Sequence, residues 1–140
     1  MFMRQRALVP VTVVLMMLPA ACGRTASDDV PTEDAPSSGP VTDCGTFELS
    51  QGERPPETAV RCLVDAVEAR IRARLKVTRP TVEGDPIPVT YVTHADGSVE
   101  VITDARQDKF GSGDIQRMTC VRPSLTPDGP DFAECSEPAP

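Results

Sequence analysis

Hydrophobic residues recur with two different periods along this chain, and the change of period separates one helix from several strands. From Pro55 onward the apolar residues return every three or four positions, which predicts an amphipathic helix of about fifteen residues. Pro55 and Pro56 suit its first turn, where no amide hydrogen is needed. Cys62 lies on the apolar side, so we expect it to face the core. The apolar face consists of Ala59, Leu63, Ala66, Val67 and Ile71.

After the helix, apolar and polar residues alternate, as they do in strands with one buried face. This alternation predicts strands over residues 73–79, 87–93, 98–104 and 115–121. Asp96 and Gly97, between the second and third of them, are typical of a tight hairpin turn. Phe47 and Leu49 suggest a strand before the helix, and a short last strand is expected near 132–135. The pattern therefore predicts an α+β domain, with one helix packed on a mostly antiparallel sheet of four to five strands.

The first 21 residues are typical of a bacterial export signal. Two arginines come first, an apolar run over 7–18 follows, and small residues precede Cys22. The apolar run is too short to cross a bilayer as a helix, so we interpret 1–21 as a signal peptide that is removed. A cysteine at this junction predicts a lipoprotein in which Cys22 carries acyl chains, palmitate among them. Such an anchor would hold the protein on the extracytoplasmic face of the cell membrane.

The residues around Cys22 leave a second processing route open. Pro19 stands where lipoprotein signals have an aliphatic residue, and Ala21 with Gly23 fits ordinary secretory cleavage after Gly23. The odd count of five cysteines favours the lipoprotein route, because one thiol is then used at the anchor. Residues 22–42 are rich in Ser, Thr, Pro, Asp and Glu, and we predict that they form a disordered tether.

The other four cysteines lie in the remaining domain, 43–140, and an exported protein favours disulfides. A bridge between Cys44 and Cys62 would fix the first strand to the helix. A bridge between Cys120 and Cys135 would join the ends of a proline-rich loop, 121–134. Four cysteines allow three pairings, and we expect the pairing that consists of these two bridges. A zinc site is disfavoured because no C-x-x-C pair occurs.

Several short motifs between residues 74 and 135 carry a resemblance to a known family. They are EGDPI at 83–87, DG at 96–97, TD at 103–104, DKFGSG at 108–113, and the cysteines Cys120 and Cys135. In their order and spacing they resemble a family of small bacterial lipoproteins catalogued as a domain of unknown function. The resemblance implies a lipoprotein with an α+β fold, in agreement with lipidation at Cys22. It implies no activity, since neither the family's description nor its motifs names one.

The loop after residue 104 holds the best candidate binding residues, which are Asp104, Asp108, Phe110 and Asp114. Carboxylates on a glycine-rich loop suit Ca²⁺, but their spacing is not that of an EF-hand, and we expect no metal or cofactor. We expect Phe110 to anchor the loop by packing on the core. An exposed Phe110 would instead indicate a binding site. We expect Gly-Asp-Pro, which contains Asp85, to form a turn, because Pro86 restricts Asp85 to an extended backbone.

Charge and the remaining polar residues narrow the function further. A formal net charge of −7 disfavours nucleic acid as a partner. His94, the only histidine, has no nucleophile motif to serve, and the basic run from Arg70 to Lys76 is interpreted as solvated residues near the helix end. We predict a monomeric, non-enzymatic domain that binds an unknown protein or small ligand. The alternative is an inhibitor of a secreted enzyme that uses the disulfide-braced loop 121–134.

Overall fold

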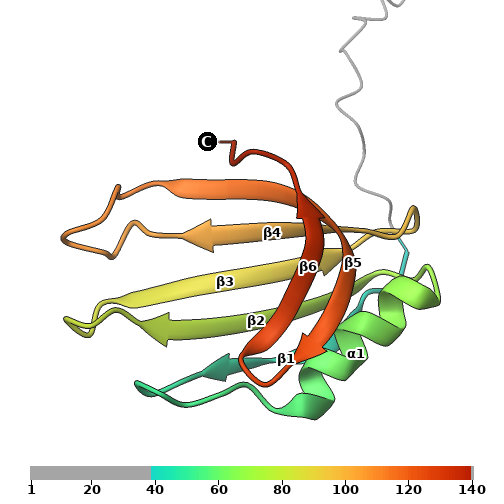
Figure 1. Ribbon diagram of the computed structural model, residues 1–140, viewed down its shortest axis with the longest axis horizontal. Helices are drawn as coiled ribbons and strands as arrows, with labels where there is room; N and C mark the ends of the chain where they lie inside the picture. Colours follow the sequence, from blue (N-terminus) through green and yellow to red (C-terminus); the bar gives the residue numbers. More distant parts are fainter. Residues whose placement is uncertain (1–38, 140) are drawn as a thin grey trace, which may run out of the picture. The chain divides into compact units, whose positions relative to one another are not determined.

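The computed structural model describes residues 39–139, in which one helix packs against a curved sheet of six strands (Figure 1). The predicted α+β class is confirmed, whereas the expected four to five strands are too few. The predicted signal peptide 1–21 and Cys22 lie outside the described residues. Of the predicted tether 22–42, only residues 39–42 are described, and Thr42 is already the first residue of a strand.

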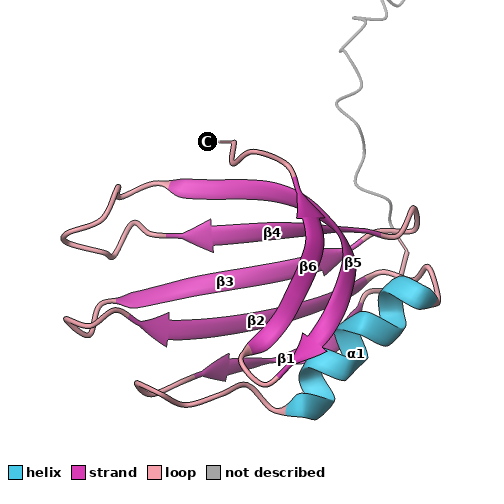
Figure 2. Ribbon diagram, viewed as in Figure 1, coloured by secondary structure: helices cyan, strands magenta, loops and turns pink. Residues whose placement is uncertain are grey.

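The elements follow one another simply along the chain. They are β1 (Thr42–Glu48), α1 (Glu57–Glu68), β2 (Ala73–Pro80), β3 (Pro86–Thr93), β4 (Ser98–Asp104), β5 (Ile115–Thr126) and β6 (Gly129–Cys135). The spatial order of the strands equals their chain order. Strands β1 and β2 run parallel because α1 connects them, and every other neighbouring pair is antiparallel (Figure 2).

The helix is shorter than the hydrophobic pattern predicts. It has 12 residues, and it ends where Arg70 adopts a positive φ of 57°. Ile71 therefore lies beyond the helix and is 46% exposed, so its expected place on the buried face is wrong. Ala59, Leu63 and Ala66 are buried as predicted. The hydrophobic pattern does not mark the end of the helix, because Ile71 is apolar whether it lies in the helix or just beyond it.

The core lies on the concave face of the sheet, where α1 packs. Leu63 of α1 is fully buried against a layer of side chains from the strands. These are Leu75 and Val77 of β2, Tyr91 of β3, Val99 and Val101 of β4, and Cys120 of β5. The sheet curls so far that the rings of Tyr91 and Phe132, from β3 and β6, stack with centroids 6.2 Å apart. Burial of this apolar surface is the main stabilising term of the domain.

The segment 121–134 is a β-hairpin, not the irregular loop expected from its prolines. Strand β5 continues to Thr126, and Pro123 lies opposite Phe132 of β6. Strand β4 begins at Ser98, opposite Val121, so beyond Val121 β5 has a partner strand on one side only within residues 39–139. A proline is tolerated there because it interrupts no bond to β4. The hairpin bends across α1 (Figure 1).

Both expected disulfides are present. Cys44 bonds to Cys62 with Cα atoms 5.7 Å apart, and Cys120 bonds to Cys135 with Cα atoms 4.0 Å apart. The first bridge joins β1 to α1. A bulge between Asp43 and Gly45 accompanies it, and the buried Cys44 is the extra residue of that bulge. The second bridge joins residues that are directly opposite in the ladder of β5 and β6.

The residues after β6 extend the sheet along β5. Ser136 donates its backbone N–H to the carbonyl of Thr119, and Ala139 exchanges two backbone hydrogen bonds with Arg117. These residues occupy the edge of β5 that β6 leaves open. The described part of the chain contains no helix that is long and apolar enough to cross a membrane.

The loops of the domain gather at two opposite ends of the sheet (Figure 1). One end has the turn 81–85 and the loop 105–114, and we call these two segments the tip. The other end has the turn 94–97 and the link between α1 and β2. The described chain begins at this second end, since Thr42 pairs with Ala73 at the start of β2.

Candidate binding site

The first half of the tip is the turn between β2 and β3. The N–H of Thr81 donates to the carbonyl of Asp85 at 2.8 Å, and the N–H of Gly84 donates to the carbonyl of Thr81 at 3.0 Å. Gly84 has a positive φ of 92°, which a side chain would strain. The expected turn before Pro86 is confirmed.

Asp85 joins the two halves of the tip. Its residue is only 6% exposed, and its carboxylate accepts hydrogen bonds from the Lys109 Nζ at 2.7 Å and the Lys109 N–H at 3.1 Å. These bonds, from the side chain first and then from the backbone, lower the pKa of Asp85. The same carboxylate raises the pKa of Lys109. The turn and the loop are therefore held together by one ion pair that spans 24 residues of sequence.

Of the three aspartates predicted as candidates, Asp104 and Asp108 bind groups of the loop through their carboxylates, and Asp114 does so through its backbone carbonyl. Asp104 accepts hydrogen bonds from the Arg106 Nε at 2.9 Å and Nη2 at 2.7 Å, which lower its pKa to about 2. Asp108 accepts the N–H groups of Phe110 and Gly111. The carbonyl of Asp114 accepts the N–H of Ala105. Within 39–139 no three His, Cys, Asp or Glu side chains are grouped as a metal site would require.

Phe110 does not anchor the loop, and the expectation that it packs on the core is wrong. The residue is 78% exposed, and Val82 on the adjoining turn is 80% exposed. They are the two most exposed large hydrophobic residues of the described chain. The ring is not needed as an anchor because Asp108 and the Asp85–Lys109 pair already hold the loop. An exposed aromatic ring on a braced loop is the arrangement that we expect of a binding site.

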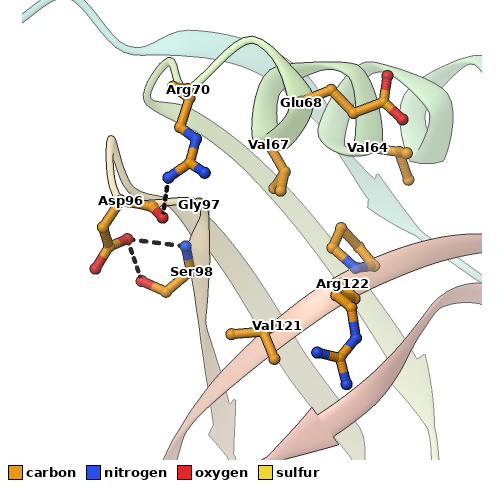
Figure 3. Close-up of a pocket in the computed structure, with 10 residues that line it drawn as sticks. Val64, Val67, Glu68, Arg70, Asp96, Gly97, Ser98, Val121 and Arg122 are labelled. Atoms are coloured by element: carbon orange, nitrogen blue, oxygen red, sulfur yellow. Dashed lines mark hydrogen bonds between the residues drawn. The ribbon is translucent and has the colours of Figure 1, made fainter.

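A hollow at the opposite end of the sheet is a second candidate site, and we call it the groove (Figure 3). It has a volume of about 580 Å³. Its apolar surface comes from Val64 and Val67 of α1 and from Val121 and Pro123 of β5, all of them half-buried. Its remaining lining residues are Glu68, Arg70, Asp96, Gly97, Ser98 and Arg122.

Arg70 occupies a backbone position that favours glycine. The N–H of Ile71 bonds to the carbonyl of Ala66 and the N–H of Arg70 bonds to the carbonyl of Val67, so the helix ends in a Schellman motif. The residue after the C-cap of this motif is left-handed and is usually glycine. An L side chain in this conformation costs roughly 1 kcal/mol. Arg122, at the bend of β5, has the same left-handed conformation with a φ of 54°.

Hydrogen bonds close one end of the groove. Arg70 donates from Nη1 to the carbonyl of Asp96, and the Asp96 carboxylate accepts the Ser98 N–H at 2.8 Å and the Ser98 hydroxyl at 2.6 Å (Figure 3). The two bonds from Ser98 lower the pKa of Asp96. His94 belongs to the same turn and donates its N–H to the carbonyl of Ser98. The expected hairpin at Asp96 and Gly97 is confirmed.

The sequence motifs indicate part of the tip, and they do not indicate the groove. The motifs at 83–87 and 108–113 mark both halves of the tip, although nothing in them shows that Asp85 and Lys109 meet. Arg70 was interpreted as a solvated residue near the helix end. The sequence does not show that Arg70 is left-handed, because a helix end of this kind is normally recognised by a glycine at that position.

The fold and the two sites define a small, disulfide-braced α+β domain with an exposed aromatic tip and a half-open groove. Comparison of the chain with protein-family models, with curated proteins and with solved structures finds no match.

Proposed function

We propose that this protein is a lipid-anchored, non-enzymatic domain that binds a partner protein outside the cell membrane through its tip. The observation that carries the proposal is the exposure of Phe110, 78%, on a loop that is fixed without it. Aromatic residues are enriched among the side chains that contribute most to protein interfaces. Val82 adds a second exposed apolar side chain on the neighbouring turn.

The bracing of the tip supports this role. Loops that are ordered before binding lose less conformational entropy in a complex. Asp108 holds the backbone on both sides of Phe110, through the N–H groups of Phe110 and Gly111. Asp85 and Lys109 then fix this loop to the turn that carries Val82. The two apolar side chains are thus presented on one rigid support.

The position of the tip also agrees with an anchored protein. The described chain begins at the end of the sheet opposite to the tip (Figure 1). An acyl anchor at Cys22, as the sequence predicts, would leave the tip at the far end of the domain from the attachment point. A partner in the extracytoplasmic space would then reach Phe110 without competing with the membrane.

The proposal is tested by cross-linking from the tip. Phe110 of the full-length protein is replaced by a photoreactive phenylalanine in living cells, and Val41, which is exposed at the opposite end of the sheet, is replaced in the same way as a control. We expect a discrete cross-linked protein from position 110 and none from position 41. The captured protein is then purified, and its binding to the wild-type protein and to Phe110→Ala is measured.

We expect Phe110→Ala to weaken this binding by about tenfold or more, which is typical of a central aromatic contact. Leu125→Ala, on the hairpin of β5 and β6, is the matched control and should leave the affinity unchanged. Identical cross-linked products from positions 110 and 41, or equal affinities of the wild type and Phe110→Ala, would contradict the proposal.

A further inference from the structure

We infer that the groove binds a small amphiphilic carboxylate, whose apolar body lies on the valine side chains and whose carboxylate is bound by Arg70. The groove and the tip are at opposite ends of the sheet, so this inference is independent of the proposed function. A ligand of this class has an apolar chain or ring system of moderate length and one carboxylate at its end.

The apolar part of the groove offers the surface for such a body. Val64 and Val67 of α1 face Val121 of β5 across the hollow (Figure 3), and Pro123 of β5 also lines it. All four remain half-buried, because the hairpin of β5 and β6 bends away from β4 at this point. Covering these side chains would remove apolar surface from water. The volume of about 580 Å³ lies within the range of small-molecule sites.

Arg70 supplies the charge. None of the ion pairs within 39–139 includes it, and its hydrogen bond is made to a neutral group, the carbonyl of Asp96. A guanidinium group has five N–H donors, and a carboxylate accepts two of them in a bidentate pair. Figure 3 shows the side chain at one end of the groove, directed toward the turn at Asp96 and Gly97.

Of the other charged groups that line the groove, Asp96 and Arg122 have partners, and Glu68 is directed away from Arg70. The Asp96 carboxylate is bonded to Ser98, and Arg122 pairs with Glu134 on β6. Glu68 extends along the helix away from Arg70 (Figure 3). Arg70 is thus the cation that is placed to bind a head group beside the apolar surface.

The backbone of Arg70 makes the inference testable without disturbing the fold. Glycine is the residue favoured at this left-handed position, so Arg70→Gly removes the guanidinium and relieves the backbone at the same time. A cation near a helix C-terminus is itself favourable, and Arg70→Lys retains it. Loss of binding in the glycine variant can therefore be separated from loss of stability.

The experiment measures octanoate binding by titration calorimetry to the full-length protein in phosphatidylcholine nanodiscs, with empty nanodiscs as the blank. Octanol, which has the same chain length and no charge, is the comparison ligand. We expect saturable binding of one octanoate, and binding of octanol weaker by about tenfold or more. Saturable binding of octanol with the same affinity, or no saturable binding of octanoate at millimolar concentration, would overturn the inference.

The variants then assign the carboxylate to Arg70. We expect Arg70→Gly to bind octanoate about tenfold or more weakly with an unchanged or higher melting temperature, and Arg70→Lys to stay within about threefold of the wild type. Arg61→Gln, an exposed arginine of α1 that pairs with Glu57 outside the groove, is the control and should bind normally. Normal binding of octanoate by Arg70→Gly would show that Arg70 does not bind the carboxylate and would reject the inference.

Discussion

Phe110 and Asp85 lie close together along the tip and have opposite environments. The aromatic ring is exposed, whereas the carboxylate is buried and paired with Lys109. This reverses the usual preference, in which the apolar group is inside and the charged group is outside. The reversal is stable because the Asp85 carboxylate has two hydrogen bonds from Lys109, which offset the loss of water around it.

The exposure of Phe110 predicts that its ring contributes little to stability. We expect Phe110→Ala to change the free energy of unfolding by less than about 0.5 kcal/mol, as is usual for surface substitutions. Leu75→Ala, at a fully buried position of β2, should lower it by about 2–5 kcal/mol. Thermal or denaturant unfolding of the two variants measures both values. A loss of about 3 kcal/mol from Phe110→Ala would show that the ring packs on the core in solution.

The lowered pKa of Asp85 predicts a dependence of stability on pH. A carboxyl whose pKa is lower in the folded than in the unfolded state stabilises the fold above the unfolded value, which is about 4. This contribution is lost as the pH falls through the folded pKa. We therefore expect Asp85→Asn to be less stable than the wild type at pH 7, with a difference that shrinks below about pH 4.

Unfolding by urea at pH 7 and at pH 3 measures this difference. Asp104, with a pKa of about 2, adds to the loss of wild-type stability in acid and is present in both proteins, so it cancels in the comparison. Asp131→Asn, an exposed aspartate on β6, is the control and should match the wild type. An equal difference between wild type and Asp85→Asn at both pH values would contradict the role of the charged pair.

The hydrophobic pattern predicts which side chains are buried where they lie in a regular strand or helix. It does not predict this for side chains in loops. Leu75, Val77 and Val99 were placed correctly because alternate residues of a strand face the same side. Phe110 was placed wrongly because hydrophobicity alone gives no direction to a loop side chain. The pairing of Asp85 with Lys109 depends on two loops meeting in space, which neither loop encodes by itself.

At the scale of elements, the strands β2, β3 and β4 were predicted to within about one residue, and β5 and β6 were not. The prolines at 123 and 130 indicate an irregular loop, but both lie in a hairpin, where β5 beyond Val121 has β6 as its one partner strand within residues 39–139. The helix α1 was predicted correctly in position and too long. Its end is set by the conformation of Arg70, which a hydrophobic pattern does not report.

One disulfide joins a strand to the helix and the other joins two strands, so their removal should affect different parts of the fold. By loop entropy, each double Cys→Ala variant should lose about 3 kcal/mol of stability. Among the described residues, strand β1 pairs only with β2, whereas Cys135 lies in a ladder that continues on both sides of it. Loss of the bridge between Cys44 and Cys62 should therefore release β1 selectively.

Amide hydrogen exchange distinguishes the two variants. We expect the amides of β1 to exchange faster in Cys44→Ala/Cys62→Ala than in the wild type, with β3 and β4 affected only through global stability. In Cys120→Ala/Cys135→Ala, the amides of β1 should keep their protection relative to the rest of the sheet. A uniform rise of exchange in the first variant would show that β1 does not depend on the bridge.

At the scale of the whole molecule, the position of the described domain depends on the predicted anchor. We expect the full-length protein to fractionate with membranes, and Cys22→Ala either to be released or to retain its signal peptide. Mass spectrometry of the mature N-terminus measures the outcome directly. A mature protein that begins elsewhere, or that has an unacylated Cys22, would contradict the anchor and leave the ordinary secretory route.

The short segment after β6 affects whether two copies of the protein can pair through the edge of β5. By bonding to Thr119 and Arg117, residues 136–139 cover backbone groups that would otherwise form an open strand edge. An open edge is a template for pairing with the same strand of a neighbouring molecule. A chain trimmed before Ser136 would lose this cover and gain a tendency to polymerise. We therefore expect residues 136–139 to limit such pairing along this part of β5.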